Sequence, residues 1–331
     1  MNTPESVAVI ISTYNEERHI DACLNALLAQ TVPVRIVVVD GGSRDRTLAR
    51  LRTRASEDRR IEVYADGIRR NLPDALNLAI QLCSETYIAK VDARTFILPD
   101  FLERALAVFA REDSTVACVG GRPEQFGETT FGEGVARARM SRFGVGGSGY
   151  ADSRETADVD TVQCGIYRRE ALNAIGGFDA DLQFGEDEEL NWRLRQAGYR
   201  IVLDARIRFR YLTRSTWLAA FAQYRNYGRA RVSVVEKHPE FLRIRHLAPS
   251  ALVAAAALLV CAAPLIPGAR AVAYSLGFTY MLGALYAATV ASRDRYCYIP
   301  HTAAAFSALH FGYGVGLLEG IYARAKRSFA Q

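Results

Sequence analysis

The chain has 331 residues, half of them apolar, and a formal net charge of +5. That length suffices for one domain with a large core and an additional segment. The charge is modest and no nucleic-acid-binding signature is present, so a nucleic-acid partner is not expected. No cleavable signal is expected either, because the first apolar run, residues 7–11, is short and follows Pro4 and Glu5.

Cysteine usage points to a reducing compartment. Six cysteines are scattered without a paired spacing: Cys23, Cys83, Cys118, Cys164, Cys261 and Cys297. This pattern argues against both a zinc site and a disulfide framework, and it favours reduced thiols in the cytosol.

Short β-branched runs alternate with amphipathic stretches through the first third of the chain. Residues 7–11, 35–39, 61–64 and 86–91 have the length and composition of strands, and residues 20–28 and 74–82 have helical apolar spacing. Continuous Val/Ile strands alternating with helices predict a mostly parallel, Rossmann-like α/β sheet covered on both faces. Ligands bind such sheets at the carboxyl ends of the strands.

Polar clusters follow the predicted strands at those ends. They are Ser-Thr-Tyr-Asn-Glu at 12–16, Asp-Gly-Gly-Ser-Arg-Asp at 40–45, Arg-Arg-Asn at 69–71 and Asp-Ala-Arg at 92–94. Asp40 is either a ligand-reading carboxylate or a turn former ahead of two glycines. Arg69 and Arg70 are equally well explained as phosphate ligands and as surface charges.

The most unusual stretch is the acidic run at 186–189, Glu-Asp-Glu-Glu, which lies just beyond a Gly-Gly-Phe-Asp loop at 176–179. Four consecutive carboxylates repel one another and need either open water or cationic partners. Leu190 and Leu194 predict a helix that begins at the run, and acids are favoured at a helix start for that reason alone. Carboxylates at a loop-to-helix junction are also well placed to take a proton from a bound hydroxyl.

After residue 206 the chain becomes basic and aromatic, and after residue 247 it becomes strongly apolar. The stretch 211–246 fits either a helix in a membrane interface or a helix packed on the preceding domain. Residues 247–267 and 271–292 are each near the ~20 residues that span a bilayer, and they predict a helical hairpin. The third apolar segment, 299–322, is expected to lie in the interface or to re-enter, because a full span would place the basic residues that follow it outside. Its His310 and Glu319 are best explained as helix-packing polar residues.

The motifs at 12–16, 40–45, 92–94, 176–179 and 185–187, in this order and spacing, resemble those of the inverting family 2 glycosyltransferases with a GT-A fold. The resemblance covers about residues 7–210. Within that family the chain looks most like the membrane-associated enzymes of succinoglycan type, through residues 72–77, 91–94 and 223–229. These enzymes add sugars to polyprenyl-diphosphate-linked glycans.

The resemblance implies a role for each donor-side residue. The nucleobase would be held by Thr13, Tyr14 and Glu16, and Asp40 would read the base or the ribose. Ser43, Arg70, Asp92 and Arg94 complete the expected nucleotide-sugar site. Asp92 would also hold a divalent ion, Mg²⁺ or Mn²⁺, but Arg94 stands where the family pattern has the second acid. We therefore expect weaker metal dependence, with Arg94 binding the diphosphate directly, or a site shared by Asp92 and another acid.

On the acceptor side, the resemblance makes Asp187 the general base, with Glu186 beside it. Gln223, Tyr224, Tyr227 and Arg229 resemble part of an acceptor-binding element of processive relatives, and they are expected to meet the acceptor's diphosphate. The element is incomplete, since no tryptophan follows it. Processive synthesis is therefore not expected.

The sequence thus predicts a GT-A catalytic domain at 1–210, an interface segment at 211–246 and a membrane domain at 247–331. Its expected activity is inverting transfer from a nucleotide sugar, with UDP favoured, to a polyprenyl-diphosphate-linked glycan. The expected location is the cytoplasmic membrane, with the catalytic domain facing the cytoplasm. Two alternatives stay open: transfer to polyprenyl monophosphate, and an inactive membrane-bound sensor of nucleotide sugars.

Overall fold

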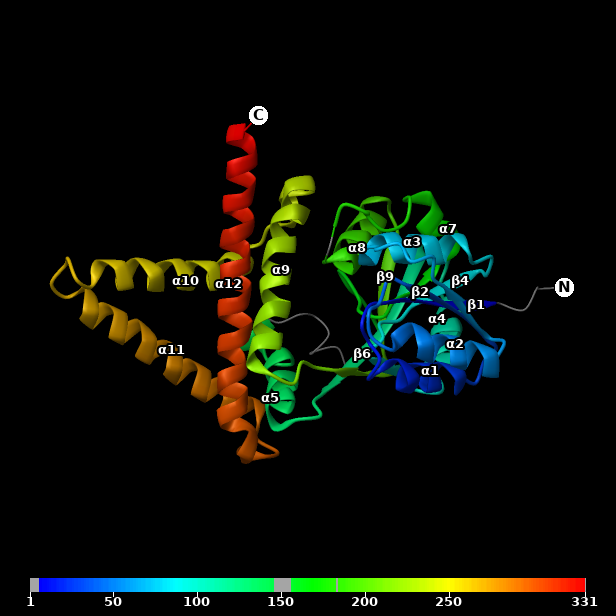
Figure 1. Ribbon diagram of the computed structural model, residues 1–331, viewed down its shortest axis with the longest axis horizontal. Helices are drawn as coiled ribbons and strands as arrows, with labels where there is room; N and C mark the ends of the chain where they lie inside the picture. The colour runs from blue at the N-terminus through cyan, green and yellow to red at the C-terminus, as the bar shows by residue number, and fades with distance from the viewer. Residues whose placement is uncertain (1–5, 146–155, 183, 331) are drawn as a thin grey trace. The chain divides into compact units, whose positions relative to one another are not determined.

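The computed structural model of the protein describes residues 6–145, 156–182 and 184–330. The chain forms two compact units (Figure 1). Unit 1 comprises Met1–Glu124 and Asp152–Tyr211, and unit 2 comprises Gln125–Ala151 and Leu212–Gln331. The described residues 125–145 therefore group with the C-terminal helices, whereas the sequence analysis placed them in the catalytic domain. The functional division at residues 210 and 246 stays a prediction.

Unit 1 is an α/β layer structure, as the alternation of strands and helices predicts. Its strands are β1 (Val7–Thr13), β2 (Val34–Asp40), β3 (Ile61–Tyr64), β4 (Tyr87–Lys90), β5 (Thr95–Ile97), β6 (Val116–Phe126), β7 (Ala157–Asp158), β8 (Ile166–Arg168) and β9 (Arg200–Leu212). Its helices are α1 (Ile20–Leu28), α2 (Thr47–Glu57), α3 (Leu72–Gln81), α4 (Phe101–Phe109), α7 (Arg169–Ala174) and α8 (Glu186–Gln196). The last residues of β6 and β9 lead into unit 2.

The strands form one sheet in the order β3-β2-β1-β4-β8-β6-β9-β5, with β7 paired to β9. The first four strands are parallel, as predicted. The pairs β4–β8, β6–β8, β5–β9 and β7–β9 are antiparallel, so the sheet as a whole is mixed. Short antiparallel partners need no helical crossover, which explains why the βαβ rhythm of the sequence fades after β4.

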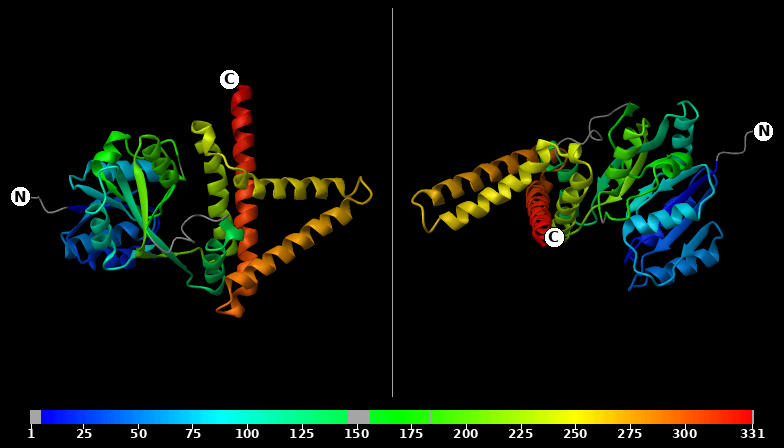
Figure 2. Two further views of the ribbon diagram at one scale, coloured as in Figure 1. Left: turned by 180° about the vertical axis from the view of Figure 1, so that it is seen from behind. Right: turned by 90° about the horizontal axis from the view of Figure 1, so that it is seen from above.

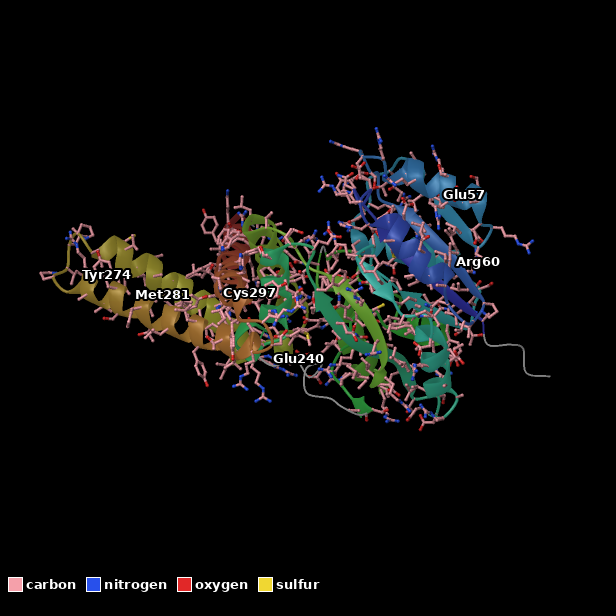
Figure 3. All side chains as sticks on the ribbon, turned by 90° about the horizontal axis from the view of Figure 1, so that it is seen from below. Glu57, Arg60, Glu240, Tyr274, Met281 and Cys297 are labelled. Carbon is pink, nitrogen blue, oxygen red and sulfur yellow. The ribbon has the colours of Figure 1, made fainter. Side chains whose placement is uncertain are left out.

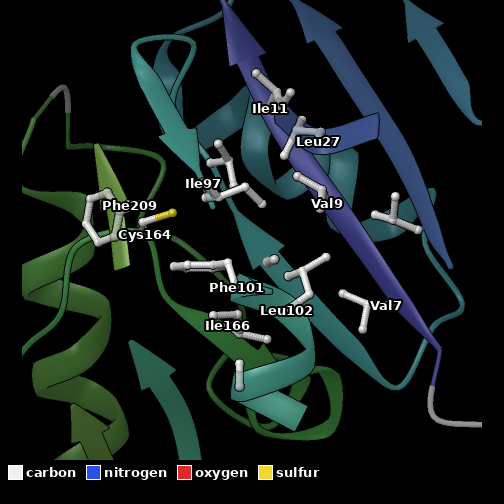
Figure 4. Close-up of a cluster of buried hydrophobic side chains, with 14 of the residues drawn as sticks. Val7, Val9, Ile11, Leu27, Ile97, Phe101, Leu102, Cys164, Ile166 and Phe209 are labelled. Atoms are coloured by element: carbon white, nitrogen blue, oxygen red, sulfur yellow. The ribbon is translucent and has the colours of Figure 1, made fainter. Parts of the chain in front are cut away.

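The core of unit 1 lies between the sheet and helices α1 and α4 (Figure 4). Val9 and Ile11 of β1 lie beside Leu27 of α1, while Phe101 of α4 stands edge-on to Phe209 of β9. Every residue of β1 is apolar through Ile11 because both faces of this strand are covered. This burial fixes the strand ends at which the polar clusters begin.

Unit 2 is helical. Its elements are α5 (Thr130–Arg139), α6 (Arg142–Val145), α9 (Trp217–Lys237), η1 (Pro239–Phe241), α10 (Ile244–Ala262), α11 (Ala269–Ala291), η2 (Tyr296–Tyr298) and α12 (Ile299–Ala330). Helix α12 lies along α9 and also contacts α5, α10 and α11 (Figure 2). The approach of α12 to α9 is close because Gly316 faces the backbone carbonyl of Arg225, where a Cβ atom would clash. Small residues of this kind let helices pack in membranes.

Two helices of the described chain, α10 and α11, are long and apolar enough to cross a membrane. Only 6% and 11% of their most apolar stretches are buried, so they are not core helices of a soluble domain. Exposed side chains such as Tyr274 and Met281 line α11 (Figure 3). The predicted pair of apolar helices is therefore present, with boundaries a few residues from those expected.

The third apolar segment was expected either to lie in the membrane interface or to re-enter, and the structure argues against re-entry. Helix α12 continues without a break from Ile299 to Ala330, which excludes a re-entrant loop there. His310 Nε2 lies 2.8 Å from the Phe143 carbonyl oxygen, and its Nδ1 lies 3.0 Å from the Tyr280 hydroxyl. Glu319 accepts hydrogen bonds from Arg225 and Arg229 of α9. Both residues thus have the helix-packing role that the sequence favoured.

Candidate active site

Three of the expected site residues lie at the carboxyl ends of adjacent parallel strands. Thr13 ends β1 and is the register partner of Asp40, which ends β2. Asp92 follows β4, the strand on the other side of β1. The Gly41 amide donates to the Thr13 carbonyl oxygen at 2.8 Å, which extends the pairing into the first loop. The parallel topology therefore gathers residues that are up to eighty positions apart.

Asp40 holds the turn that follows β2. Its Oδ2 accepts from the amides of Gly42 at 3.1 Å and Ser43 at 2.9 Å, while Oδ1 faces the Thr13 hydroxyl at 3.4 Å. The side chain is buried. The turn-forming role considered from the sequence is thus seen directly, and reading of the nucleotide remains a prediction for the same carboxylate.

The first two loops are tied to each other. The Asn15 amide donates to Ser43 Oγ at 3.0 Å, and the Arg44 amide donates to Asn15 Oδ1 at 2.8 Å. Asn15 adopts a φ of 54°, a left-handed conformation that asparagine tolerates better than most residues. Ser43 therefore links the two loops, whatever it does for a ligand.

An aromatic ring stands at the edge of this site with an arginine over it. The Arg69 guanidinium lies 3.5 Å from the centroid of the Tyr14 ring, and it also donates to the Gly41 carbonyl oxygen. Arg70, the arginine predicted to bind the nucleotide, pairs with Asp66 in its own loop. Phosphate binding by Arg69 and a nucleotide role for Arg70 both stay predictions.

Glu16 and Arg94 form an ion pair, with Arg94 Nε 3.1 Å from Glu16 Oε1. The other carboxylate oxygen of Glu16, Oε2, is enclosed and has no hydrogen-bond partner among the residues that the structure describes. Buried polar atoms without partners are uncommon and call for a ligand or water. The pair therefore presents one fixed acceptor and one guanidinium to the same region.

At the centre of the site is Lys90, the last residue of β4, which is only 2% exposed. Its Nζ lies 2.8 Å from Asp187 Oδ2, 3.0 Å from Glu186 Oε1 and 3.1 Å from Asp92 Oδ1. The ammonium donates hydrogen bonds to Glu186 and Asp187 and forms an ion pair with Asp92. The cationic partner that the acidic run requires is thus a lysine from the sheet.

Electrostatics distinguish Asp187 from its neighbours. Burial raises the pKa of Asp187 to about 7, against the opposing effect of Lys90, and Glu186 and Asp92 raise it further. Although burial disfavours its charged form, Asp187, Asp92 and Glu186 hold the pKa of Lys90 well above its usual value. A carboxylate whose pKa lies near neutrality is suited to accept a proton in a reaction at physiological pH.

One oxygen of Asp187 lacks a partner. Oδ2 faces Lys90, whereas Oδ1 is enclosed and accepts no hydrogen bond from any described residue. The Asp187 side chain is 18% exposed, and that of Glu186 is 10% exposed. A hydroxyl group brought to Asp187 would supply the donor that Oδ1 lacks.

The rest of the acidic run has a structural role. Glu189, 1% exposed, forms two hydrogen bonds with Arg193 one turn later in α8. Arg193 also donates to the carbonyl oxygens of Ile175 and Gly177 at 2.7 Å each. Helix α8 therefore fixes the glycine loop ahead of it.

The same loop is fixed from the other side by α3. Asn77 forms two hydrogen bonds with the backbone of Phe178, at 2.7 and 2.8 Å. Gly177 has a φ of +74°, and a Cβ at this position would lie 2.5 Å from Asn77 Oδ1. Only glycine suits this position, which accounts for the Gly-Gly sequence in the motif.

The residues present fit a divalent ion poorly. Asp92 Oδ1 already faces the Lys90 ammonium, and the next acid position of the motif is Arg94, which pairs with Glu16. Among the residues that the structure describes, no three His, Cys, Asp or Glu side chains are arranged to share a metal ion. The carboxylates that converge do so on a lysine nitrogen.

The expected acceptor residues lie in unit 2, on α9. Gln223 donates to the Tyr227 hydroxyl at 3.0 Å, Tyr224 is buried among residues of α5 and α12, and Arg229 pairs with Glu319 of α12. These contacts give all four residues a packing function. Their role toward an acceptor stays a prediction.

Lys90, Arg193 and Asn77 were not recognised as site residues from the sequence. For Lys90 a signal was available: it is the one charged residue inside the apolar run 86–91, and a lysine in a strand buried on both faces must be paired. Arg193 could have been paired with Glu189 from their i,i+4 spacing. Its contacts with the glycine loop, and those of Asn77, are with backbone atoms, which no residue pattern predicts.

Comparison with known proteins identifies the first half of the chain. The sequence profile described as "Glycosyl transferase family 2" matches residues 8–176. The chain is 31% identical over 260 residues to the succinoglycan biosynthesis protein ExoA of Rhizobium meliloti, a match that covers 77% of each chain.

A second relative comes from Methanococcus voltae. The dolichyl N-acetyl-alpha-D-glucosaminyl phosphate 3-beta-D-2,3-diacetamido-2,3-dideoxy-beta-D-glucuronosyltransferase of this organism is 27% identical over 240 residues, 70% of this chain and 74% of the relative. Among solved structures, the mannosyltransferase PcManGT of Pyrobaculum calidifontis, in complex with GDP-Man and Mn²⁺, superposes with a TM-score of 0.64. It is 21% identical, with 96% of this chain and 87% of that chain covered, so the likeness shows a shared GT-A fold.

Proposed function

The chain belongs to glycosyltransferase family 2, and from this premise we propose that it transfers a sugar, with inversion, from a nucleoside diphosphate to a lipid-linked glycan. The acceptor we propose is a polyprenyl-diphosphate-linked glycan on the way to a polysaccharide or other surface glycan. Support for that class comes from the printed names of the relatives: one acts in succinoglycan biosynthesis and the other on a dolichyl-linked sugar.

The observation that carries the proposal is the hydrogen bonding and the raised pKa of Asp187. In an inverting transfer the acceptor oxygen forms a bond to the anomeric carbon as the bond from that carbon to the diphosphate breaks. The acceptor's proton must leave at the same time, and a carboxylate can take it. Asp187 has an oxygen without a partner among the described residues and a pKa raised to about 7 by burial, and Lys90 holds its other oxygen in place.

On the donor side we propose that Tyr14, Glu16 and Asp40 bind the nucleoside and that Arg94 and Arg69 meet the diphosphate. The Glu16–Arg94 pair offers a carboxylate acceptor and a guanidinium in one place. Guanidinium groups bind phosphate oxygens bidentately and would stabilise the charge on the leaving diphosphate.

Asp40→Asn separates the two roles of Asp40. The amide retains an oxygen for the Gly42 and Ser43 amides, so the turn and the unfolding temperature should change little. A hydrogen bond from the nucleoside to a charged acceptor is lost, and donor affinity should fall by about 10- to 100-fold. Calorimetric titration with UDP and GDP measures the change. An unchanged affinity for both nucleotides would show that Asp40 only stabilises the turn and does not bind the nucleoside.

We propose that α10 and α11 anchor the enzyme in the cytoplasmic membrane as a hairpin, with the catalytic unit on the cytoplasmic side. Their apolar side chains are exposed, and arginines at 293 and 295 follow α11, as the positive-inside tendency requires for its cytoplasmic end. An anchored enzyme remains next to an acceptor that cannot leave the bilayer.

The hairpin topology can be tested with cysteines at its two ends. Cys297 is exposed just after α11, and Pro267 lies in the turn between the helices. In a Cys261→Ser background, a membrane-impermeant maleimide should label Pro267→Cys in intact cells and should label Cys297 only after permeabilisation. Labelling of Cys297 in intact cells would contradict the proposed orientation.

The proposed activity is tested by supplying labelled nucleotide sugars to membranes that contain the protein and reading label in the organic-extractable lipid. At least one nucleotide sugar should give protein-dependent label in a lipid that carries more than one sugar. A lipid product with a single sugar, released by mild acid, would indicate transfer to polyprenyl monophosphate instead. If no donor gives label in any lipid fraction, the proposal of a lipid-linked acceptor is overturned.

A further inference from the structure

Lys90 is an unusual residue to find at the end of a buried strand. It is 2% exposed and follows Ile88 and Ala89, which are fully buried. Transfer of a charged ammonium from water into such a position is strongly unfavourable unless the charge is paired and every donor is used. An apolar side chain could fill the same space without the free-energy cost of burying a charge. The positive charge of Lys90 therefore needs its own explanation.

The three carboxylates around Lys90 come from the two motifs that matter most for transfer. Asp92 belongs to the Asp-Ala-Arg motif after β4, and Glu186 and Asp187 begin α8. Three carboxylates at one point either take up a proton or need a cation between them. A divalent ion is one solution to that problem, and a buried ammonium is another.

We propose that Lys90 is the resident cation of this site and takes the place of a divalent ion among Asp92, Glu186 and Asp187. The inference rests on the proposed transferase function for its catalytic meaning, but not for its test. Lys90 acts through Asp187 as a positioning residue: it fixes Oδ2 at 2.8 Å and leaves Oδ1 for the acceptor hydroxyl. The base is thus oriented before any substrate binds.

The surrounding charges agree with this assignment. Arg94 stands where a second metal-binding acid would be needed, and its guanidinium is held by Glu16. A cation placed between Asp92 and Asp187 would meet Lys90 at close range and be repelled by it. Lys90 is paired with three carboxylates, so the diphosphate of the donor must be met by other groups, with Arg94 and Arg69 as candidates.

Mn²⁺ binding to the purified full-length protein tests the proposal without any need for transfer activity. Electron paramagnetic resonance with Mn²⁺ alone should show no site in the wild type that depends on Asp92. In Lys90→Met the three carboxylates lose their cation, and Mn²⁺ affinity should rise by at least about tenfold. The double variant Lys90→Met/Asp92→Asn should lose the acquired site. Lys326→Met, which removes an exposed lysine, is the matched control and should bind as the wild type does.

Lys90→Arg keeps the charge and provides a second variant in case Lys90→Met fails to fold. It should bind no more Mn²⁺ than the wild type. An Asp92-dependent Mn²⁺ site in the wild type would overturn the proposal, and so would a folded Lys90→Met protein without increased Mn²⁺ affinity. If Lys90→Met does not fold, the wild type and Lys90→Arg decide between the two outcomes.

Transfer activity in excess EDTA provides the functional arm. The wild type should retain most of its activity after chelation. Complete loss of activity that Mn²⁺ restores would contradict the proposal while leaving the transferase function intact. Conversely, the wild type could show no sugar transfer while Lys90→Met acquires a Mn²⁺ site. That result would support Lys90 as the resident cation and count against the proposed transferase function.

Discussion

Asp187→Asn is expected to lower the rate of sugar transfer by about 10²- to 10⁴-fold, the usual contribution of a positioned general base. The amide has nearly the shape of the carboxylate and can still accept a hydrogen bond from Lys90, so the cluster should stay assembled. It cannot take the acceptor's proton. Donor affinity should stay within a few-fold of wild type, because no donor contact is assigned to Asp187. Initial rates with a labelled nucleotide sugar and calorimetric titration with UDP or GDP measure the two effects separately.

The control for this variant is Glu188→Gln, which removes the adjacent charge of the same run. The carboxylates found within 3.1 Å of Lys90 Nζ belong to Asp92, Glu186 and Asp187, so substitution of Glu188 should leave the rate close to wild type. Near wild-type turnover by Asp187→Asn would show that Asp187 is not the general base. Glu186, which pairs with the same lysine, would then be the next candidate.

Arg193→Met should destabilise unit 1 by about 3–5 kcal/mol, the usual effect of removing one partner of a buried ion pair. Glu189, almost fully buried, would lose its guanidinium partner. The carbonyl oxygens of Ile175 and Gly177 would lose their donors as well, which should loosen the glycine loop ahead of α8. We expect the midpoint of thermal unfolding, followed by circular dichroism, to fall by about 10 °C.

Arg195→Met is a matched control on the same helix. Arg195 pairs with Asp160 where both side chains are substantially exposed, and exposed pairs contribute about 0–1 kcal/mol. Glu189→Gln combined with Arg193→Met should recover part of the lost stability, because the buried charge is then removed with its partner. Equal effects of Arg193→Met and Arg195→Met would show that the buried pair does not hold the loop.

The grouping of polar residues at one edge of the sheet could be predicted from the sequence because it depends on local patterns. Continuous Val/Ile runs identify parallel strands such as β1 and β2, and the polar residues after them lie at one edge of the sheet by topology. Thr13, Asp40 and Asp92 were placed correctly at neighbouring strand ends for that reason. The beginning of α8 at the acidic run was predicted in the same way, from Leu190 and Leu194.

What the sequence could not give is the set of partners made by long-range packing. Lys90 and Asp187 are 97 positions apart, and no periodicity connects a strand residue to a helix start. The placement of α5 beside α12 in unit 2 likewise joins segments far apart in the chain, through the cluster that contains Val135 and Phe306. Sequence patterns specify each element, whereas contacts between elements depend on how their faces meet.

The most direct test of the reaction geometry is an experimental structure of Asp187→Asn with an intact nucleotide sugar bound. The anomeric carbon should face the side chain at position 187, with its bond to the diphosphate pointing away toward Arg94 and with Lys90 still bridging Asp92 and Glu186. A sugar whose anomeric carbon is turned away from position 187, or a metal ion found where the Lys90 ammonium lies, would contradict the account.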